Sequence, residues 1–258
     1  MKTLINSLTL LLIAVCNFSY AQNARFTTSG TIQFEKSSNT HAIVPRMITK
    51  DNEAFYKPAF EQQKATQPQF RVLKSEFKFA DNKTLFTPIA PETRYSGISV
   101  PIMEQYSTVY TDLGTNIATS QKEIYGDVVL LTDTARKINW KITDETRDIA
   151  GYPCRRANAL IMDSIYVVAF YTDKIPVSGG PESFNGLPGM ILQVALPHEN
   201  ISWVATKVTD MAVPAKEIVA PKKGKVTSNK DYRALLDKVL KGQGNAAIMQ
   251  LYYKAFLL

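Results

Sequence analysis

The sequence predicts a mainly β fold: a curved antiparallel sheet or partial barrel with a C-terminal α-helix. Three observations support this fold class. Short runs of alternating apolar and polar residues recur along most of the chain, as half-buried strands do. Turn-forming residues separate many of these runs. Near the C-terminus the apolar residues change to the spacing of a helix.

The first residues predict a signal peptide, residues 1–21, that is removed after export. Lys2 is the only charged residue before Arg25, and residues 8–16 are almost wholly apolar. Small residues suited to a signal peptidase follow and end at Ala21. The apolar stretch is too short to cross a bilayer, which takes about 20 apolar residues. We therefore expect an exported protein, either of the periplasm or cell envelope or secreted.

The mature chain, residues 22–258, is expected to form a single β-rich domain, because no linker or internal repeat divides it. The formal net charge of the whole chain is +7. A basic balance suits nucleic acid, an anionic membrane surface or acidic ligands. Export argues against nucleic acid, whereas association with a membrane surface stays open. The lysine-rich stretch from Lys216 to Lys230 fits a solvated loop. We expect no transmembrane segment in the mature chain.

Alternation and turn residues predict the strands of the first half of the chain. Residues Asp51–Lys64 fit a short helical excursion. The expected strands are Thr31–Glu35, a hairpin over Phe70–Phe86 with its turn at Asp81-Asn82, Ser107–Leu113, and Ile117–Thr132 with a break at Glu123–Asp127.

The second half continues as a meander and ends in helix. Residues Arg136–Thr143 alternate, with Ile138, Trp140 and Ile142 facing one way. Ser228 begins a capping-box pattern, and the apolar residues from Tyr232 to Leu240 then follow one helical face. The other expected elements are strands Tyr152–Met162, Ser164–Tyr171, Met190–Leu196 and Ile201–Val208, and a second helix over Asn245–Leu258.

One loop, Asp173–Gly189, differs from the rest of the chain. Three of the 13 prolines and four of the 12 glycines lie in these 17 residues. Proline fixes φ and glycine allows positive φ, so their mixture specifies an irregular path. Ile175, Val177, Phe184 and Leu187 are apolar and favour burial, which argues against a flexible linker. The loop is expected either to plug one end of the sheet or to form the lip of a binding site.

Residues Phe184–Leu192 resemble the signature of the GLPGLI family, which is named after a hexapeptide. The hexapeptide here reads Gly-Leu-Pro-Gly-Met-Ile, with Met190-Ile191 where Leu-Ile is usual. Residues 149–157 are similar to the family's second stretch, Gly-Tyr-x-Cys-x-x-Ala, and Trp140 and Glu145 stand at familiar distances before it. The resemblance covers residues 70–210 and implies an exported protein of a Gram-negative bacterium. It implies no activity, and no catalytic residue follows from it.

Enzymatic chemistry has weak support in the sequence. A Ser–His–acid set could be drawn from Ser178 or Ser183 with His198, but the Gly-x-Ser-x-Gly elbow is missing. Cys154 is the only cysteine of the mature chain, and a lone thiol is either buried or reactive. No ligand spacing predicts a metal site; if one exists, Cys154 and His198 are the candidates. We expect no catalytic residue and no cofactor.

The interpretation that fits best is an exported envelope protein with a non-catalytic binding or assembly-support role. A curved sheet with an apolar face can hold an apolar ligand, a peptide or a strand of an envelope protein. Metal or thiol handling through Cys154 is the alternative, and a hydrolase comes third. The candidate ligand-binding residues lie in the unusual loop and its neighbouring strands: Tyr171, Pro176, Phe184, Gly186, Leu187, Pro188, Gly189 and Trp203.

Overall fold

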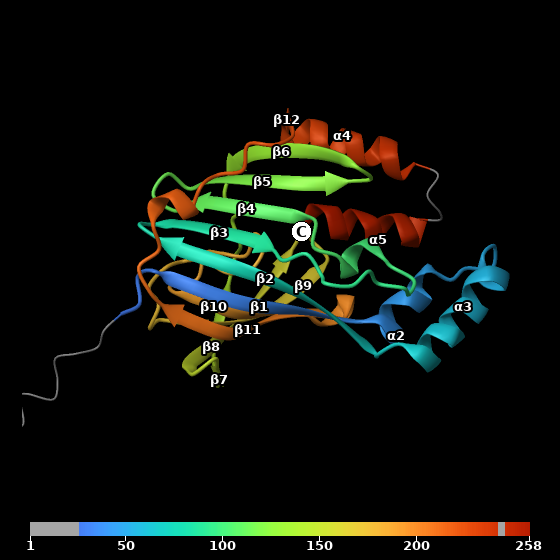
Figure 1. Ribbon diagram of the computed structural model, residues 1–258, viewed down its shortest axis with the longest axis horizontal. Helices are drawn as coiled ribbons and strands as arrows, with labels where there is room; N and C mark the ends of the chain where they lie inside the picture. Colours follow the sequence, from blue (N-terminus) through green and yellow to red (C-terminus); the bar gives the residue numbers. More distant parts are fainter. Residues whose placement is uncertain (1–25, 242–245) are drawn as a thin grey trace, which may run out of the picture.

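Twelve strands form one sheet, which is the main feature of the structure (Figure 1). The structure is a computed structural model that describes residues 26–241 and 246–258, so the expected signal peptide, residues 1–21, lies outside the described residues. The strands are β1 (Gly30–Asn39), β2 (Phe70–Ala80), β3 (Lys83–Pro88), β4 (Ser107–Asp112), β5 (Ile117–Ile124), β6 (Asp127–Thr134), β7 (Lys141–Ile149), β8 (Tyr152–Ile161), β9 (Ile165–Thr172), β10 (Met190–Leu196), β11 (Ile201–Asp210) and β12 (Lys225–Thr227). The helices are α2 (Thr40–Ile43), α3 (Glu53–Thr66), α4 (Asn229–Leu240) and α5 (Ala246–Leu257), with short 3-10 turns η1 (Val44–Met47), η2 (Pro101–Met103), η3 (Pro197–Glu199) and η4 (Ala215–Glu217).

Strand β1 lies inside the sheet and separates two antiparallel meanders. On one side the order runs from β2 to β6 and ends at β12, and on the other it runs from β11 to β7. Neighbouring strands are antiparallel except β12 and β6, which run parallel. The sheet does not close, because its edge strands β12 and β7 do not pair with each other. The predicted fold class, a mainly β protein with a C-terminal helix, is confirmed.

Several local predictions are also confirmed. Asp81 and Asn82 join β2 to β3 with positive φ values of 50° and 58°, as a two-residue hairpin of type I′ requires. At the start of α4 the Ser228 hydroxyl accepts a hydrogen bond from the Asp231 N–H at 3.1 Å, which satisfies one of the helix's free donors. The second predicted helix is α5. The expected helical excursion is α3, a 14-residue helix that contains Pro58.

The strand predicted over Arg136–Thr143 is wrong in position. Residues 135–140 form no strand, and β7 begins at Lys141 and ends at Ile149. Ile138 is buried and Trp140 half-buried because both pack against the main core without joining a ladder. The lysine-rich stretch is exposed, as expected, but it also contains the short strand β12.

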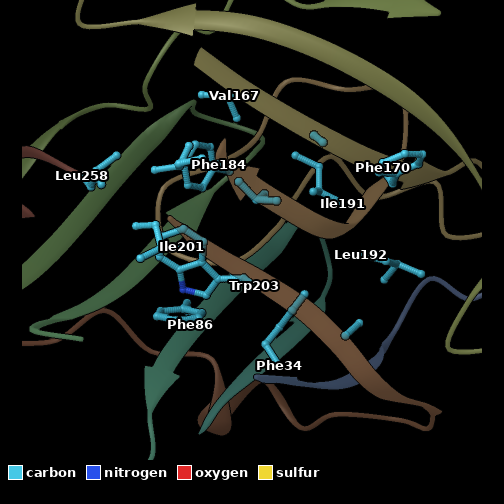
Figure 2. Packing of buried hydrophobic residues seen from close by; sticks show 14 of the residues in the cluster. Phe34, Phe86, Val167, Phe170, Phe184, Ile191, Leu192, Ile201, Trp203 and Leu258 are labelled. Atoms are coloured by element: carbon cyan, nitrogen blue, oxygen red, sulfur yellow. The ribbon is translucent and has the colours of Figure 1, made fainter. Parts of the chain in front are cut away.

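The core lies on one face of the sheet, which we call the inner face and which carries Phe34, Phe77, Phe86 and Trp203. Figure 2 shows Phe34, Phe86 and Trp203 gathered there. Burying one such side chain stabilises the fold by about 1.5–3 kcal/mol. Helix α4 covers the inner face at β5 and β6, where Tyr232, Leu236 and Leu240 meet Ile124, Val129 and Leu131.

Helix α5 packs between α4 and the main core. Its residue Leu251 lies in the same cluster as Trp203, and Phe256 lies in the cluster of α4. Lys254 pairs with Glu199, a carboxylate that also meets Arg46 at 2.9 Å. Across residues 26–241 and 246–258, no helix has the length and apolar character needed to span a bilayer.

Candidate functional site

The loop between β9 and β10, residues 173–189, crosses the inner face of the sheet; we call it the GLPG loop. Its path is fixed by hydrogen bonds to the strand that follows it, because Met190 N–H donates to Ile175 O at 3.0 Å and Ile191 N–H to Gly179 O at 2.8 Å. The Trp140 indole donates to Asn185 O at 2.8 Å. The loop is therefore a fixed part of the interior.

Glycine is required where this loop rejoins the sheet. At Gly189, φ is +150°, and a Cβ added there would lie 2.1 Å from the carbonyl oxygen of Thr172. At Gly186 φ is +91°, and the nearest atom to an added Cβ is Trp140 Nε1 at 3.6 Å. Glycine is thus required at position 189 because a Cβ has no room, and at position 186 because φ is positive.

The structure divides the candidate ligand-binding residues into a buried and an exposed group. Figure 2 shows Phe184 in the same cluster as Trp203, and their ring centroids are 5.9 Å apart. Core packing accounts for the buried group, so its role in binding a ligand stays a prediction. The buried residues are Tyr171, Phe184, Leu187, Gly189 and Trp203, and the exposed ones are Pro176, Gly186 and Pro188.

Cys154 is buried in β8, with 1% of its surface exposed. Burial, together with the negative charge of Asp148, raises the pKa of its thiol to about 12. The thiol is therefore protonated at neutral pH, and it donates weakly to Tyr152 O at 3.3 Å.

His198 lies far from that thiol. Its ring lies 6.3 Å from the ring of Tyr166, which pairs with Leu160 on β8. Six strand residues, about 20 Å at about 3.3 Å per residue, separate Leu160 from Cys154. The two candidate metal ligands therefore do not meet. In the part of the chain that the structure describes, no three His, Cys, Asp or Glu side chains gather as a metal site would require.

The two candidate serine nucleophiles have other partners. Ser183 donates its hydroxyl proton to Leu258 O at 2.9 Å, and Ser178 accepts from Gly186 N–H at 3.0 Å. Among the described residues neither serine is hydrogen-bonded to His198. The arrangement gives no support to the third hypothesis, a hydrolase.

A cluster of buried charges on the inner face is the most unusual feature of the interior; we call it the charge cluster. It consists of Lys36 on β1, Lys122 on β5, Arg136 after β6 and Glu182 of the GLPG loop. Lys36, Lys122 and Glu182 are 4%, 7% and 8% exposed. Glu182 has φ +52°, a left-handed conformation that costs a non-glycine residue of order 1–3 kcal/mol. The loop therefore holds this carboxyl group at the cluster at a conformational cost.

Burial and mutual charge shift the pKa values in this cluster. Burial lowers the pKa of Lys36 to about 8, against the attraction of Glu182 and Glu104. Burial and the positive charge of Arg136 lower the pKa of Lys122 to about 8, against the attraction of Glu182. Burial raises the pKa of Glu182, and Lys36, Lys122 and Arg136 oppose the shift.

Neutral contacts hold the lysines in place. Lys36 donates to the carbonyl of Glu104 and lies 4.8 Å from the ring centre of Trp203. Lys122 donates to Phe256 O at 2.9 Å. The indole N–H of Trp203 is buried and makes no hydrogen bond within the part of the chain that the structure describes, yet it lies near enough to favour the ionised form of Glu182.

Two cavities adjoin the charge cluster. One of about 20 Å³ lies between Lys36, Lys122 and Glu182 and has the size of one water molecule. The other, of about 250 Å³, extends from Lys122 and Arg136 to Arg233 on α4. Perturbed pKa values beside a cavity are typical of functional sites.

Little in the sequence indicates this cluster. Its members lie between 14 and 146 positions apart along the chain, and each of them looks like an ordinary surface charge. The alternation in β1 could have drawn attention to Lys36, because it shares a parity with the core residues Ile32 and Phe34.

One family model matches the part of the chain that contains the GLPG loop. A family model described as a protein of unknown function (Porph_ging) matches residues 160–193, which span β9, the loop and the start of β10. The match does not name the GLPGLI family, so that assignment stays a proposal. No curated protein matches the chain.

Two solved structures of PNGF-II, in space groups C2 and P21, resemble the fold. Each is 15% identical to this chain, with TM-scores of 0.52 and 0.50. The similarity covers 80% and 81% of this chain but only 32% and 33% of the PNGF-II chains. The chain thus spans about a third of the length of PNGF-II. At this identity the likeness shows the fold alone.

Proposed function

We propose that the protein is an exported envelope protein that binds a ligand on the inner face of its sheet without catalysing a reaction. The observation that carries the proposal is the charge cluster, which opens onto the cavity of about 250 Å³. Taking a charge out of water costs several kcal/mol even in a relaxed protein. A fold that retains four such groups beside a cavity has a use for them other than stability.

The GLPG loop supports this proposal because it both fills and shapes the interior. Its apolar side chains Phe184 and Leu187 complete the core, which is the role of a plug. Its polar residues Glu182 and Ser183 face the two cavities, which is the role of a lip. Pro176, Gly186 and Pro188 form an exposed rim that is available to a partner.

The location in the envelope is proposed from the signal peptide and from the GLPGLI resemblance. The match to an uncharacterised family and the described helices, none of which could span a bilayer, agree with that location. The direct check is the N-terminus of the protein recovered from its own cells, which should be Gln22.

The experiment that tests binding is native mass spectrometry of the mature protein, purified from its own envelope without added ligand. The wild-type protein should carry an adduct that Lys122→Met reduces, since the change removes a cluster charge and replaces it with a side chain of similar volume. Lys238→Met is the matched control, because Lys238 is exposed on α4 and outside the cluster.

The mass spectra distinguish the ligand-binding role from the assembly-support role. An adduct that persists in the control and falls in Lys122→Met supports binding at the inner face. A wild-type protein with only its bare mass overturns the ligand-holding function and favours the assembly-support role, in which a protein partner binds transiently.

A further inference from the structure

We propose that the cavity between β5, β6 and α4 binds a phosphate monoester through Lys122, Arg136 and Arg233. This inference rests on the proposed function and names its class of ligand. The three cations come from separate elements: strand β5, the segment after β6 and the first half of α4. Their convergence on one cavity is a property of the fold.

These cations have few carboxylate partners, although Glu182 attracts Lys122 and Arg136 from a distance. In the described ranges, no Asp or Glu carboxylate lies within 4 Å of the charged nitrogens of Lys122, Arg136 or Arg233. Lys122 donates to Phe256 O at 2.9 Å, and Arg136 donates to the main-chain oxygens of Leu257 and Leu258. The carbonyls of Phe256 and Leu257 fix the side chains in position without a formal charge, whereas the oxygen of Leu258, the last residue of the sequence, belongs to an α-carboxylate.

The excess of positive charge has an energetic cost in the empty site. Burial and repulsion by Arg233 lower the pKa of Arg136, with Glu182 opposing. Among the described residues, Asp133 is the one side-chain carboxylate that lines the cavity. It is already engaged, because it accepts from the Asn229 amide and from the Thr134 N–H at 2.7 Å. An anion in the cavity would relieve the repulsion between the cations.

The chemistry of the lining favours phosphate. Guanidinium groups bind phosphate oxygens through two parallel hydrogen bonds, and an ammonium group adds a point charge. The three cations outnumber the two carboxylates of the lining, that of Asp133 and that of the last residue Leu258, so the cavity favours an anion such as a phosphate monoester, which carries close to −2 at pH 7. The hydroxyl group of Ser120 adds a neutral donor.

The cavity also has room for the organic part of such a ligand. Met162 and Leu257 line it and continue into a neighbouring cavity of about 290 Å³, which shares Arg233. A soluble sugar or glycerol phosphate and the headgroup of a phosphatidic acid present the same chemistry to these residues. The experiment must therefore separate the two sources.

The test is isothermal titration of the mature protein with inorganic phosphate and with glycerol 3-phosphate. We expect saturable binding of one molecule, with glycerol 3-phosphate bound more tightly than inorganic phosphate. Arg233→Met should weaken binding at least tenfold, and so should Arg136→Met. Lys238→Met removes an equal charge from the same helix outside the cavity and should leave the affinity unchanged. Arg233 is exposed, so its variant should fold, which thermal melting will verify.

Vesicles of phosphatidylcholine with and without phosphatidic acid distinguish the sources of the phosphate. Cosedimentation that requires phosphatidic acid and falls in Arg233→Met indicates a lipid headgroup, whereas binding of glycerol 3-phosphate alone indicates a soluble ligand. Equal affinity of wild type and Arg233→Met, or equal affinity for succinate and phosphate, overturns the phosphate proposal. A third result would refute the phosphate inference alone: the Arg233→Met variant keeps its adduct from the envelope in native mass spectrometry, and titration with phosphate gives no heat of binding. The proposed binding function would then still hold.

Discussion

Replacing Gly189 by alanine should destabilise the protein more than any other glycine change in a turn. The added Cβ would lie 2.1 Å from Thr172 O and 2.8 Å from Thr172 C, both of them backbone atoms in β9. The residue also has φ +150°. The unfavourable conformation costs of order 1–3 kcal/mol, and the overpacking about 1–3 kcal/mol.

Together these effects predict a loss of about 2–6 kcal/mol, a large part of the 5–15 kcal/mol typical of a domain. For a protein of this size each kcal/mol lowers Tm by about 2–4 °C, so we expect a decrease of roughly 4–24 °C. Urea unfolding and calorimetry of the mature protein measure both quantities.

Gly151→Ala provides the control, because Gly151 has φ +83° in the turn between β7 and β8 but nothing within 4 Å of an added Cβ. Its cost should be about 1–2 kcal/mol, the conformational penalty alone. If Gly189→Ala and Gly151→Ala destabilise the protein equally, the close approach to Thr172 is not what requires glycine in the GLPG loop.

Three further predictions follow from single contacts. Ser228→Ala should lower the free energy of unfolding by about 1 kcal/mol, because the Asp231 N–H at the start of α4 loses its acceptor; no change in urea unfolding would refute the cap. Cys154 should resist a thiol reagent at pH 8 in the folded protein and react fully in urea, since burial raises its pKa to about 12; rapid labelling of the native protein would contradict this. The free energy of unfolding should rise between pH 8 and pH 10, because the unfolded chain then binds protons that Lys36 and Lys122, with pKa values lowered to about 8, have released in the folded state. Lys36→Met with Lys122→Met should flatten that rise, and a rise that persists would assign it to other groups.

Elements with a local signal could be predicted from the sequence. The turn at Asp81-Asn82 and the cap at Ser228 depend on neighbours along the chain, and both are where the pattern placed them. Alternation alone was less informative. It predicted a strand over Arg136–Thr143, but the apolar residues there pack against the core and Trp140 bonds the GLPG loop. An alternation of apolar and polar residues is also found in a segment that packs along the core without pairing with another strand.

The charge cluster could not be predicted, because no local pattern indicates it. Glu182 becomes a site residue only when β1, β5 and the segment after β6 converge on one side of the sheet. The apolar candidates in the loop, such as Phe184 and Leu187, are buried because they pack in the core. The charged residue among them, buried and in a left-handed conformation, carries the more specific information.

The position of β1 in the sheet has a consequence for how the chain reaches its folded state. Gly30 pairs with Asp210 across β1 and β11, so the two meanders cannot join until almost the whole chain is available. Pairings between such distant residues form slowly, because the loop must close before the contacts stabilise it. Until β11 arrives, one edge of β1 is open to pairing with other chains.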